Sequence, residues 1–433
     1  MSAGLQLVWH RGDLRTHDPA ALSAAAASGE VAGVVVLDPH ILEPASPRRR
    51  AWFFENVRAL RTSYEALGGV LLVRTGEPWT VLPQLCASVR AGCVHALRSH
   101  TPYGRERDRR TEQALGAVTW HDGLYLRAPG TVLSRARSPF TVFGAFYRVW
   151  RDGSPPEPLE PPPAISSPLG AFEDPGEIPP QESDVPLPPP GEAAGLAALR
   201  EFVELRAPTY AETRDRLDGN GGSQLSVYLS LGALSARAAA AALWDRRGAG
   251  PQKWLAELAW REFLADLLHH RPELVTHPFN PRWDRFPWND SEADFAAWRD
   301  GRTGIPAVDA AMRQLRATGW ISNRARMLAA QFLTKHLRID WRRGERVFYD
   351  WLLDGDRASN AGNWQWAAGL GIDNVPYFRV FNPVTQAQQH DPDGSWLRLW
   401  VPECHGDPGP LPGAIVDPAQ ARREYLAAVE ELS

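Results

Sequence analysis

The spacing of apolar residues changes once along this chain, and that change limits the possible folds more than any other feature. Up to about residue 150, short apolar runs alternate with stretches of helical pattern; the runs are residues 5–10, 31–39, 69–76 and 93–99. Strands that alternate with helices predict a parallel, doubly wound sheet. From residue 192 onward, apolar residues recur at helical spacing only. The sequence therefore predicts an α/β domain followed by an all-helical domain.

The expected helices have recognisable ends. For a helix over residues 47–68, Ser46 stands at the N-cap, Pro47 at the first helical position and Gly68 at the stop. In the second half, helical patterns cover residues 251–271, 305–319, 323–338 and 342–355. Thirteen of the 18 tryptophans follow residue 243, so most of them belong to the helical half.

A proline-rich segment separates the two patterns. Residues 151–191 hold 14 of the 38 prolines and show no periodicity, which predicts an extended, rather stiff connector. We therefore expect an α/β domain over 1–150, a connector over 151–191 and a helical domain over 192–433.

Composition excludes several classes of protein. No apolar run reaches the about 18 residues that a membrane-spanning helix needs, and Arg and Asp come too early for a secretory signal. The cysteines Cys86, Cys93 and Cys404 form neither a CxxC motif nor a zinc pattern. These features predict a cytoplasmic protein without a membrane partner.

The net charge and the absence of common phosphate-binding motifs argue against further classes of protein. A net charge of −4 argues against a protein that coats nucleic acid through bulk charge. Between Trp320 and Asp350, however, seven basic residues stand against three acidic ones, which leaves room for a local basic surface. The first strand is followed by "HRGDLRTHD", and neither a GxGxxG nor a GxxxxGK[ST] motif occurs.

Two helical segments carry side chains suited to a flat polar ligand. Glu257, Trp260 and Arg261 share one helix face and offer an acceptor, a stacking surface and a charged donor. The alternative is a tryptophan that covers the core beside a surface ion pair. Asn323 and Met327 share another face, and here the alternative is an ordinary solvated basic helix.

A third cluster follows an apolar helix. Asp354, Asp356, Asn360 and Asn363 gather around two glycines in "LLDGDRASNAGNWQW", a density typical of a ligand with many hydrogen-bonding edges. A capping and turn cluster without a ligand is one alternative, and a metal site with hard oxygen ligands is another. The spacing matches no EF-hand loop, so we expect no metal.

Several motifs, in order and at similar spacing, resemble the photolyase/cryptochrome family over nearly the whole chain, in particular class I cyclobutane pyrimidine dimer photolyases. They are "WHRGDLRTHDPAAL", "ELAWREF", "GRTGIPAVDAAMRQL", "GWISNRARM", "DGDRASNAGNWQWAAGLGID" and "PYFRVFNP". The resemblance implies an antenna domain followed by a helical domain that cradles one FAD in a bent shape and keeps it reduced.

The resemblance also implies roles for individual residues around the FAD. Asn360 would face the reactive nitrogen of the flavin, where plant cryptochromes place an Asp. The remaining cofactor residues would be Tyr210, Gly222, Ser223, Gln224, Leu225 and Ser226 on the phosphate side, and Arg326, Asp354 and Asp356 near the ring and ribose.

On the lesion side, the implied catalytic set is Glu257, Asn323 and Met327 together with Asn360. Related enzymes for the (6-4) photoproduct place a histidine where Met327 stands, which favours cyclobutane dimers. The implied DNA contacts are Glu257, Trp260, Arg261, Asn323, Arg324, Arg379 and Gln386, and the implied electron-transfer chain is Trp364, Trp341 and Trp288.

The activity implied is light-driven repair of UV-damaged DNA without sequence preference, by a monomer. Photolyases are among the enzymes known to flip their target out of the duplex. A second, antenna chromophore would be FMN, a deazaflavin or a folate; we favour a flavin type, with Asp38 and Arg50 as candidate contacts. The alternatives are a cryptochrome-type light sensor and a DNA-binding flavoprotein without photochemistry.

Overall fold

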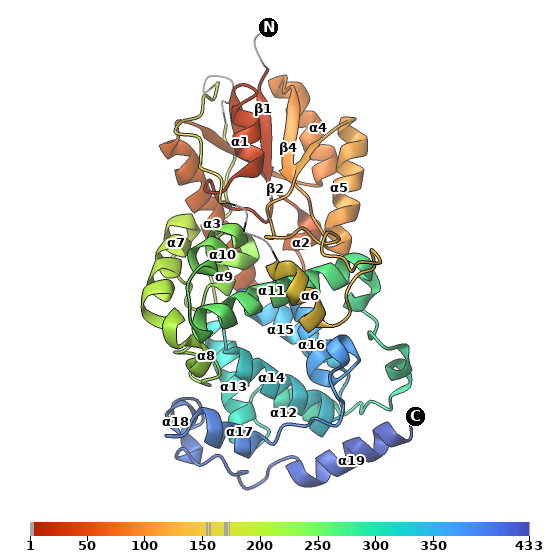
Figure 1. Cartoon of the computed structure of the whole chain (residues 1–433). Helices are drawn as coiled ribbons and strands as arrows, with labels where there is room; N and C mark the ends of the chain where they lie inside the picture. The colour runs from red at the N-terminus through yellow and green to blue at the C-terminus, as the bar shows by residue number, and fades with distance from the viewer. Residues whose placement is uncertain (1–3, 153–154, 156, 169–171, 173, 433) are drawn as a thin grey trace.

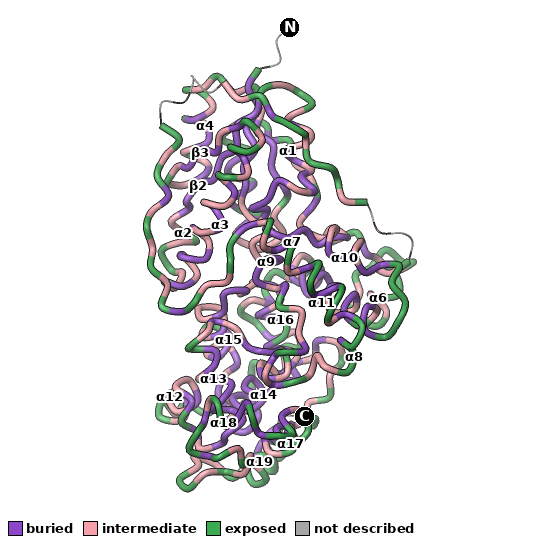
Figure 2. Tube along the Cα trace, turned by 90° about the vertical axis from the view of Figure 1, so that its left-hand side faces the viewer, coloured by how far each residue is buried: buried purple, intermediate pink, exposed green. Residues whose placement is uncertain are grey.

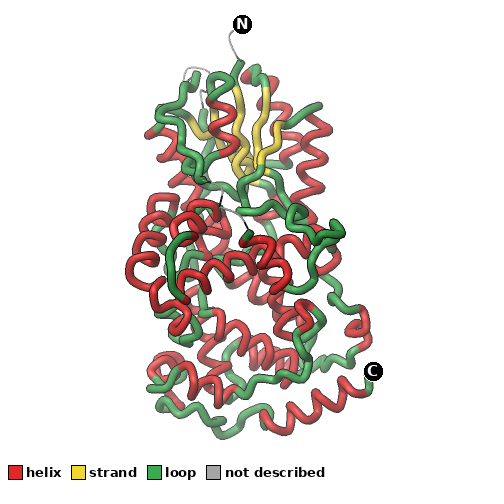
Figure 3. Tube along the Cα trace, viewed as in Figure 1, coloured by secondary structure: helices red, strands yellow, loops and turns green. Residues whose placement is uncertain are grey.

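In the computed structural model, a sheet with its helices stands above a larger body of helices (Figures 1 and 3). The structure describes residues 4–152, 155, 157–168, 172 and 174–432. No helix among these residues is long and apolar enough to cross a membrane.

The sheet is parallel throughout and has the order β3-β2-β1-β4-β5. Its strands are β1 Gln6–His10, β2 Val31–Leu37, β3 Val70–Thr75, β4 Cys93–Leu97 and β5 Thr119–His121. Successive residues of β1 face opposite sides, with Val8 in one apolar cluster and Leu7 and Trp9 in another. The helices that cover the sheet are α1 Ala20–Ala26, α2 Pro39–Leu42, α3 Pro47–Ala66, α4 Pro78–Val89 and α5 Pro102–Leu115. The predicted doubly wound sheet is confirmed, with β5 as an additional short edge strand.

Helix α3 begins at Pro47 as predicted, but Ser46 does not cap it. The Ser46 hydroxyl donates instead to the carbonyl of Asp350, 2.5 Å away in the helical half. The first turn of α3 is therefore fastened to the other part of the molecule.

Described residues of the proline-rich segment pack along the sheet. The amide of Val73 on the edge strand β3 donates to the carbonyl of Pro175 at 2.7 Å, and Ile165 and Ile178 are buried against the α/β core. An edge strand otherwise offers unpaired backbone groups to other chains, so this segment also protects the sheet.

The helical half contains two large clusters of buried apolar residues. Buried stretches of chain run through its interior, and the exposed stretches lie mainly at its surface (Figure 2). Its longer helices are α7 Gly191–Glu201, α9 Ser226–Leu231, α10 Ala236–Trp244, α11 Ala249–His270, α12 Glu292–Arg299, α13 Pro306–Thr318, α14 Asn323–Gln331, α15 Trp341–Trp351, α16 Arg357–Ala368, α17 Pro383–His390, α18 Ser395–Trp400 and α19 Pro418–Glu430. Short helical turns between them are α8 Tyr210–Thr213, η2 Phe202–Arg206, η3 Ala207–Thr209, η4 Pro272–Val275, η5 Pro281–Arg285, η6 Phe332–His336, η7 Ile372–Asn374 and η8 Pro402–Cys404.

Helix α6, Phe143–Arg151, precedes the proline-rich segment, yet it packs with the helical half. Leu126, Phe146 and Trp150 share an apolar cluster with Trp254 of α11. The domain boundary drawn at residue 150 remains a prediction, and side chains on its N-terminal side contribute to the core of the helical half.

One carboxylate joins the sheet to the helical half. Glu192, in the first turn of α7, accepts hydrogen bonds from the amide and hydroxyl of Thr16 and from the amide and ring Nδ1 of His17, at 2.6–2.9 Å. Burial alone would raise the pKa of Glu192, but these hydrogen bonds outweigh it and hold the pKa well below the ordinary 4.5. Glu192 therefore stabilises the fold above pH ~4.5, and this contribution is lost as the pH falls further.

We expect Glu192→Gln to lower the free energy of unfolding by ~2–3 kcal/mol at pH 7. The NH₂ group of Gln would face the N–H and O–H donors of Thr16 and His17, and the negative charge that attracts them would be lost. The difference from the parent protein should shrink at pH 4 and below. Urea denaturation at both pH values measures this, with the exposed Glu201 of the same helix as the matched control in Glu201→Gln. An equal loss at all pH values would contradict the assignment.

Candidate flavin and lesion pocket

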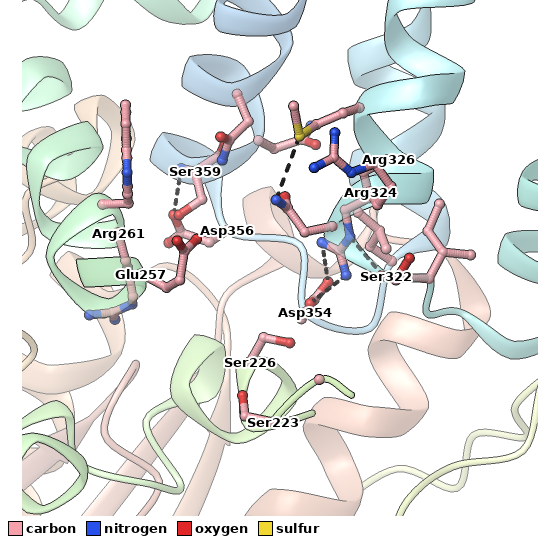
Figure 4. A pocket seen from close by; sticks show the side chains of 18 of the residues that line it. Ser223, Ser226, Glu257, Arg261, Ser322, Arg324, Arg326, Asp354, Asp356 and Ser359 are labelled. Carbon is pink, nitrogen blue, oxygen red and sulfur yellow. Dashed lines mark hydrogen bonds and ion pairs between the residues drawn. The ribbon is translucent and has the colours of Figure 1, made fainter. Parts of the chain in front are cut away.

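The helical half encloses a cavity of about 550 Å³. Its walls come from α8, the turn before α9, α11, α14, the 352–356 loop and α16 (Figure 4). Segments more than 100 residues apart thus meet in one site, and it gathers most of the residues that the sequence singled out.

A glycine-rich turn forms one wall. Tyr210, Gly222, Ser223, Gln224 and Ser226 line the cavity. A Cβ on Gly222 would approach the Gly219 carbonyl to 3.2 Å, and the backbone of Gln224 is left-handed, with φ of 57°. Such a turn exposes backbone N–H groups and hydroxyls together, which suits a pyrophosphate. The side chain of Leu225 differs from the rest: it is fully buried in the apolar core.

An ion pair fixes the opposite wall. Arg326 donates to both carboxylate oxygens of Asp354, at 3.1 and 2.8 Å. Asp356 caps α16 by accepting from the amide of Ser359 at 2.7 Å. The capping alternative therefore holds for Asp356, which also lines the cavity.

The amide of Asn360 has a defined orientation. Its Nδ2 donates to the backbone carbonyl and to Oε1 of Glu345, both at 2.8 Å. Because both N–H groups point to Glu345, the amide oxygen of Asn360 is left for the cavity. Burial raises the pKa of Glu345, while Arg357, 3.3 Å away, opposes the rise.

Charged groups surround the residues on α11 for which the family resemblance predicts lesion contacts. Glu257 is ion-paired with Arg214 and with Lys253, the latter at 3.3 Å. Trp260 lines the cavity beside it. Arg261 also borders the cavity, but its guanidinium donates to the carbonyl of Leu124 at 3.2 Å and lies over the ring of Tyr125. Arg261 thus fastens α11 to the segment ahead of α6.

The residues on α14 are also tied into a network. Asn323 contacts the sulfur of Met327 at 3.6 Å, so these two side chains meet as their spacing predicts. Arg324 pairs with Asp215 at 2.8 Å and donates to Gln386 at 3.2 Å. Gln386 and the exposed Arg379 do not line the cavity; Arg379 lies near the ring of Phe381.

Trp364 lines the cavity and is 2 % exposed. Trp341 is buried and Trp288 half-buried, and both pack against the same apolar cluster as Trp364. A Cβ on Gly344, one turn after Trp341, would come within 2.2 Å of the Trp364 ring, so α15 passes directly beside it. Trp298, which the sequence did not single out, lies 6.1 Å from Trp364 between ring centroids.

Several residues in or next to the cavity were not singled out from the sequence: Arg214, Asp215, Lys253, Trp320 and Glu345. Trp320 stands in the motif "GWISNRARM" but received no role there, and none of the motifs that carry the family resemblance contains the other four. Arg214 follows Tyr210 by one helical turn, and this spacing was the available signal. Trp320 and Trp364 both line the cavity, and their buried indole N–H groups have no hydrogen-bond partner among the described residues. Unpaired donors, a glycine turn and convergent hydroxyls fit a large polar cofactor such as FAD.

The two antenna candidates lie outside this cavity. Asp38 caps α2 by accepting from the amide of His40 at 3.0 Å, and it also accepts from the Tyr103 hydroxyl at 2.5 Å. Arg50 has a buried Nε without a hydrogen-bond partner in the described chain. Within the same described ranges, no group of three or more His, Cys, Asp or Glu residues has the geometry to hold a metal ion.

Comparisons with known proteins agree with this arrangement. Residues 6–166 match the family model described as DNA photolyase, and residues 254–431 match the FAD binding domain of DNA photolyase. A deoxyribodipyrimidine photo-lyase of Thermus thermophilus is 52% identical over 431 residues, which cover 99% of both chains.

Solved structures show the same similarity. A bacterial class III photolyase from Agrobacterium tumefaciens has a TM-score of 0.89 at 33% identity, with 100% of this chain and 98% of that chain covered. An archaeal photolyase from Sulfolobus tokodaii with two FAD molecules has a TM-score of 0.85 at 27% identity, with 99% and 100% covered. With an α/β domain, the FAD-binding helical domain and near-complete coverage, this chain belongs to the DNA photolyase family.

Proposed function

We propose that this protein is a deoxyribodipyrimidine photo-lyase that uses blue light to split cyclobutane pyrimidine dimers in DNA. The observation that supports this most is one cavity in which the glycine-rich turn and the Arg326–Asp354 pair face the lesion-side residues Glu257 and Trp260. The glycine-rich turn and the Arg326–Asp354 pair would hold reduced FAD, and that cofactor would supply the photochemical electron transfer that dimer splitting needs.

The residues of the pocket bind and orient the two reactants. Glu345 holds the amide of Asn360 so that its oxygen would be available to accept a hydrogen bond from a protonated flavin nitrogen. Trp260 stacks on the flipped dimer, a contact worth ~1–3 kcal/mol for a base on an aromatic ring. Glu257 accepts from the pyrimidine N–H edges, Asn323 offers a donor and an acceptor, and Met327 supplies an apolar contact.

Basic residues around the opening hold the DNA backbone. Arg324 binds a phosphate beside the lesion, and the exposed Arg379 binds one farther along the strand. Phosphate contacts fix position and carry no sequence information, so repair is independent of sequence. We also infer that the protein works as a cytoplasmic monomer, and that a flavin-type antenna is bound in the α/β domain, for which the second FAD of the Sulfolobus photolyase is the supporting parallel.

Purified protein with reduced FAD should remove cyclobutane dimers from UV-irradiated oligonucleotides under blue light and leave them unchanged in the dark. Loss of dimers is measured by chromatography of the oligonucleotide. Binding of FAD without any light-dependent repair would refute the proposal and would favour a light sensor. An absorption spectrum of the extracted chromophores tests the antenna.

A further inference from the structure

The indole of Trp260 is supported from behind by a second aromatic ring. Phe143, the first residue of α6, stacks on it with ring centroids 4.0 Å apart and planes inclined by 12°. Phe263, one turn along α11, meets the edge of the same indole at 5.5 Å and 80°. Trp260 lines the cavity and Phe143 does not, so Phe143 supports the indole from outside the cavity lining.

Phe143 is itself held from two sides. Tyr147 stacks on it, one turn along α6, at 5.6 Å and 19°. The Phe143 amide donates to Oδ1 of Asp373 at 2.8 Å. The N-cap residue of α6, Val142, offers no side-chain acceptor, so Asp373 satisfies this helix end across a separation of 230 residues.

The position of Asp373 is unusual in its own right. Its φ of 55° and that of Asn374, 50°, are left-handed, and Gly371 precedes them with φ of 109°. Asp and Asn adopt left-handed backbone more readily than other residues with a side chain. The turn is therefore one that Asp373 and Asn374 can form, and the bond to Phe143 ties it to α6.

We infer that Phe143 is a positioning residue for lesion recognition: with Asp373 as its anchor, it fixes the ring plane of Trp260 so that the indole meets the flipped pyrimidine dimer face to face. This inference rests on the proposed function. A flat ring behind the indole restricts its tilt in a way that an aliphatic side chain of similar volume does not, because stacked rings prefer parallel planes.

Dark binding assays separate this role from simple packing. Phe143→Leu keeps most of the volume and removes the flat face, so it should weaken binding to a dimer-containing duplex about three- to tenfold. Affinity for the same duplex without the lesion should stay unchanged, and Phe143→Tyr should restore lesion binding. Phe140 is the matched control: it packs in the same cluster, on Phe146, and Phe140→Leu should leave lesion binding as it is.

The decisive measurement combines two variants. Once Trp260→Ala has removed the indole, adding Phe143→Leu should weaken lesion binding no further. The inference is overturned if Phe143→Leu has no effect, if it weakens both duplexes equally, or if its loss is the same in the Trp260→Ala background. The assay needs no light, so a failure of blue-light repair in the parent protein would refute the proposed function separately.

Asp373 offers an independent test. Asp373→Gly removes the acceptor for the Phe143 amide but still allows left-handed backbone, and it should lower lesion affinity in the same direction. Asp373→Asn keeps an oxygen acceptor and also tolerates left-handed backbone, so it should retain lesion affinity. Rescue by the Asn variant supports the anchor. Equal loss in both variants would overturn it.

Discussion

Replacing Trp364 with Phe should abolish light-driven reduction of the bound flavin in the presence of a thiol donor. Trp364 lines the cavity, Trp341 is buried in the same apolar cluster, and the half-buried Trp288 lies against Phe286. Oxidation of an indole is accessible, whereas oxidation of a phenyl ring is not, so the substitution would interrupt the proposed route at its first member. The change of absorption during illumination measures the reduction.

Controls separate an electron route from loss of packing. Trp351→Phe alters a tryptophan of α15 that packs on the same cluster, and flavin reduction in this variant should remain normal. Repair by Trp364→Phe protein with chemically reduced FAD should persist, because repair itself does not draw on this route. Full photoreduction in the Trp364→Phe variant would contradict the assignment.

The same assay tests the course of the route. Trp298 lies 6.1 Å from Trp364, so it competes with Trp341 as the second member. The proposed chain predicts that Trp341→Phe slows photoreduction and that Trp298→Phe does not. The reverse result would move the route to Trp298.

The sequence predicted those parts of the fold that leave a local periodic signal. Parallel strands and long helices repeat apolar residues at fixed spacing, so the sheet and the helix from Pro47 could be recognised. Strand β5 was missed because it has three residues at the sheet edge and alternates little between buried and exposed.

Contacts between distant segments leave no such signal. Arg49 on α3 donates to the carbonyls of Tyr349, Leu352 and Gly355, at 2.8–3.2 Å, and so holds the loop that carries Asp354. About 300 residues separate Arg49 from these carbonyls, and no sequence pattern around Arg49 predicts the contacts. The N-terminal half therefore shapes the cofactor pocket in a way that only the folded chain reveals.

The candidate site was predictable where side chains share one helix face, as Glu257 and Trp260 do, or Asn323 and Met327. The contacts of a long side chain were not predictable, because its end group can point into the cavity or away from it. Arg261 shares the face of Glu257, yet its long side chain reaches the carbonyl of Leu124. Spacing fixes the Cβ direction only, and for arginine the contact is made several bonds farther out.

Replacing Glu257 with Ala should lower the repair yield per absorbed photon roughly tenfold. A hydrogen bond from the pyrimidine edge to a carboxylate is worth ~1.5–3 kcal/mol. The other carboxylates of the cavity wall already have partners: Asp215 pairs with Arg324, Asp354 with Arg326, and Asp356 caps α16. Glu257→Gln keeps an acceptor and should lose less. The yield is measured with counted photons at saturating dimer-containing DNA, so that weaker binding does not enter.

Glu257→Ala should also change binding to undamaged duplex DNA, and we expect that binding to become tighter. Glu257 pairs with Arg214 and with the exposed Lys253. Its removal leaves Lys253 free for a phosphate, while Arg214 keeps Asp215 as a partner at 3.5 Å. Undamaged DNA should then bind more tightly. Its affinity should also depend more steeply on salt, because each additional phosphate contact makes the slope of log K against log salt concentration more negative by ~0.9. The variant should therefore distinguish damaged from undamaged DNA less well, because it loses a contact to the lesion and binds undamaged DNA more tightly. Glu212→Ala, at an exposed acid on α8, is the matched control and should change neither quantity; an unchanged yield in Glu257→Ala would remove this carboxylate from the proposed mechanism.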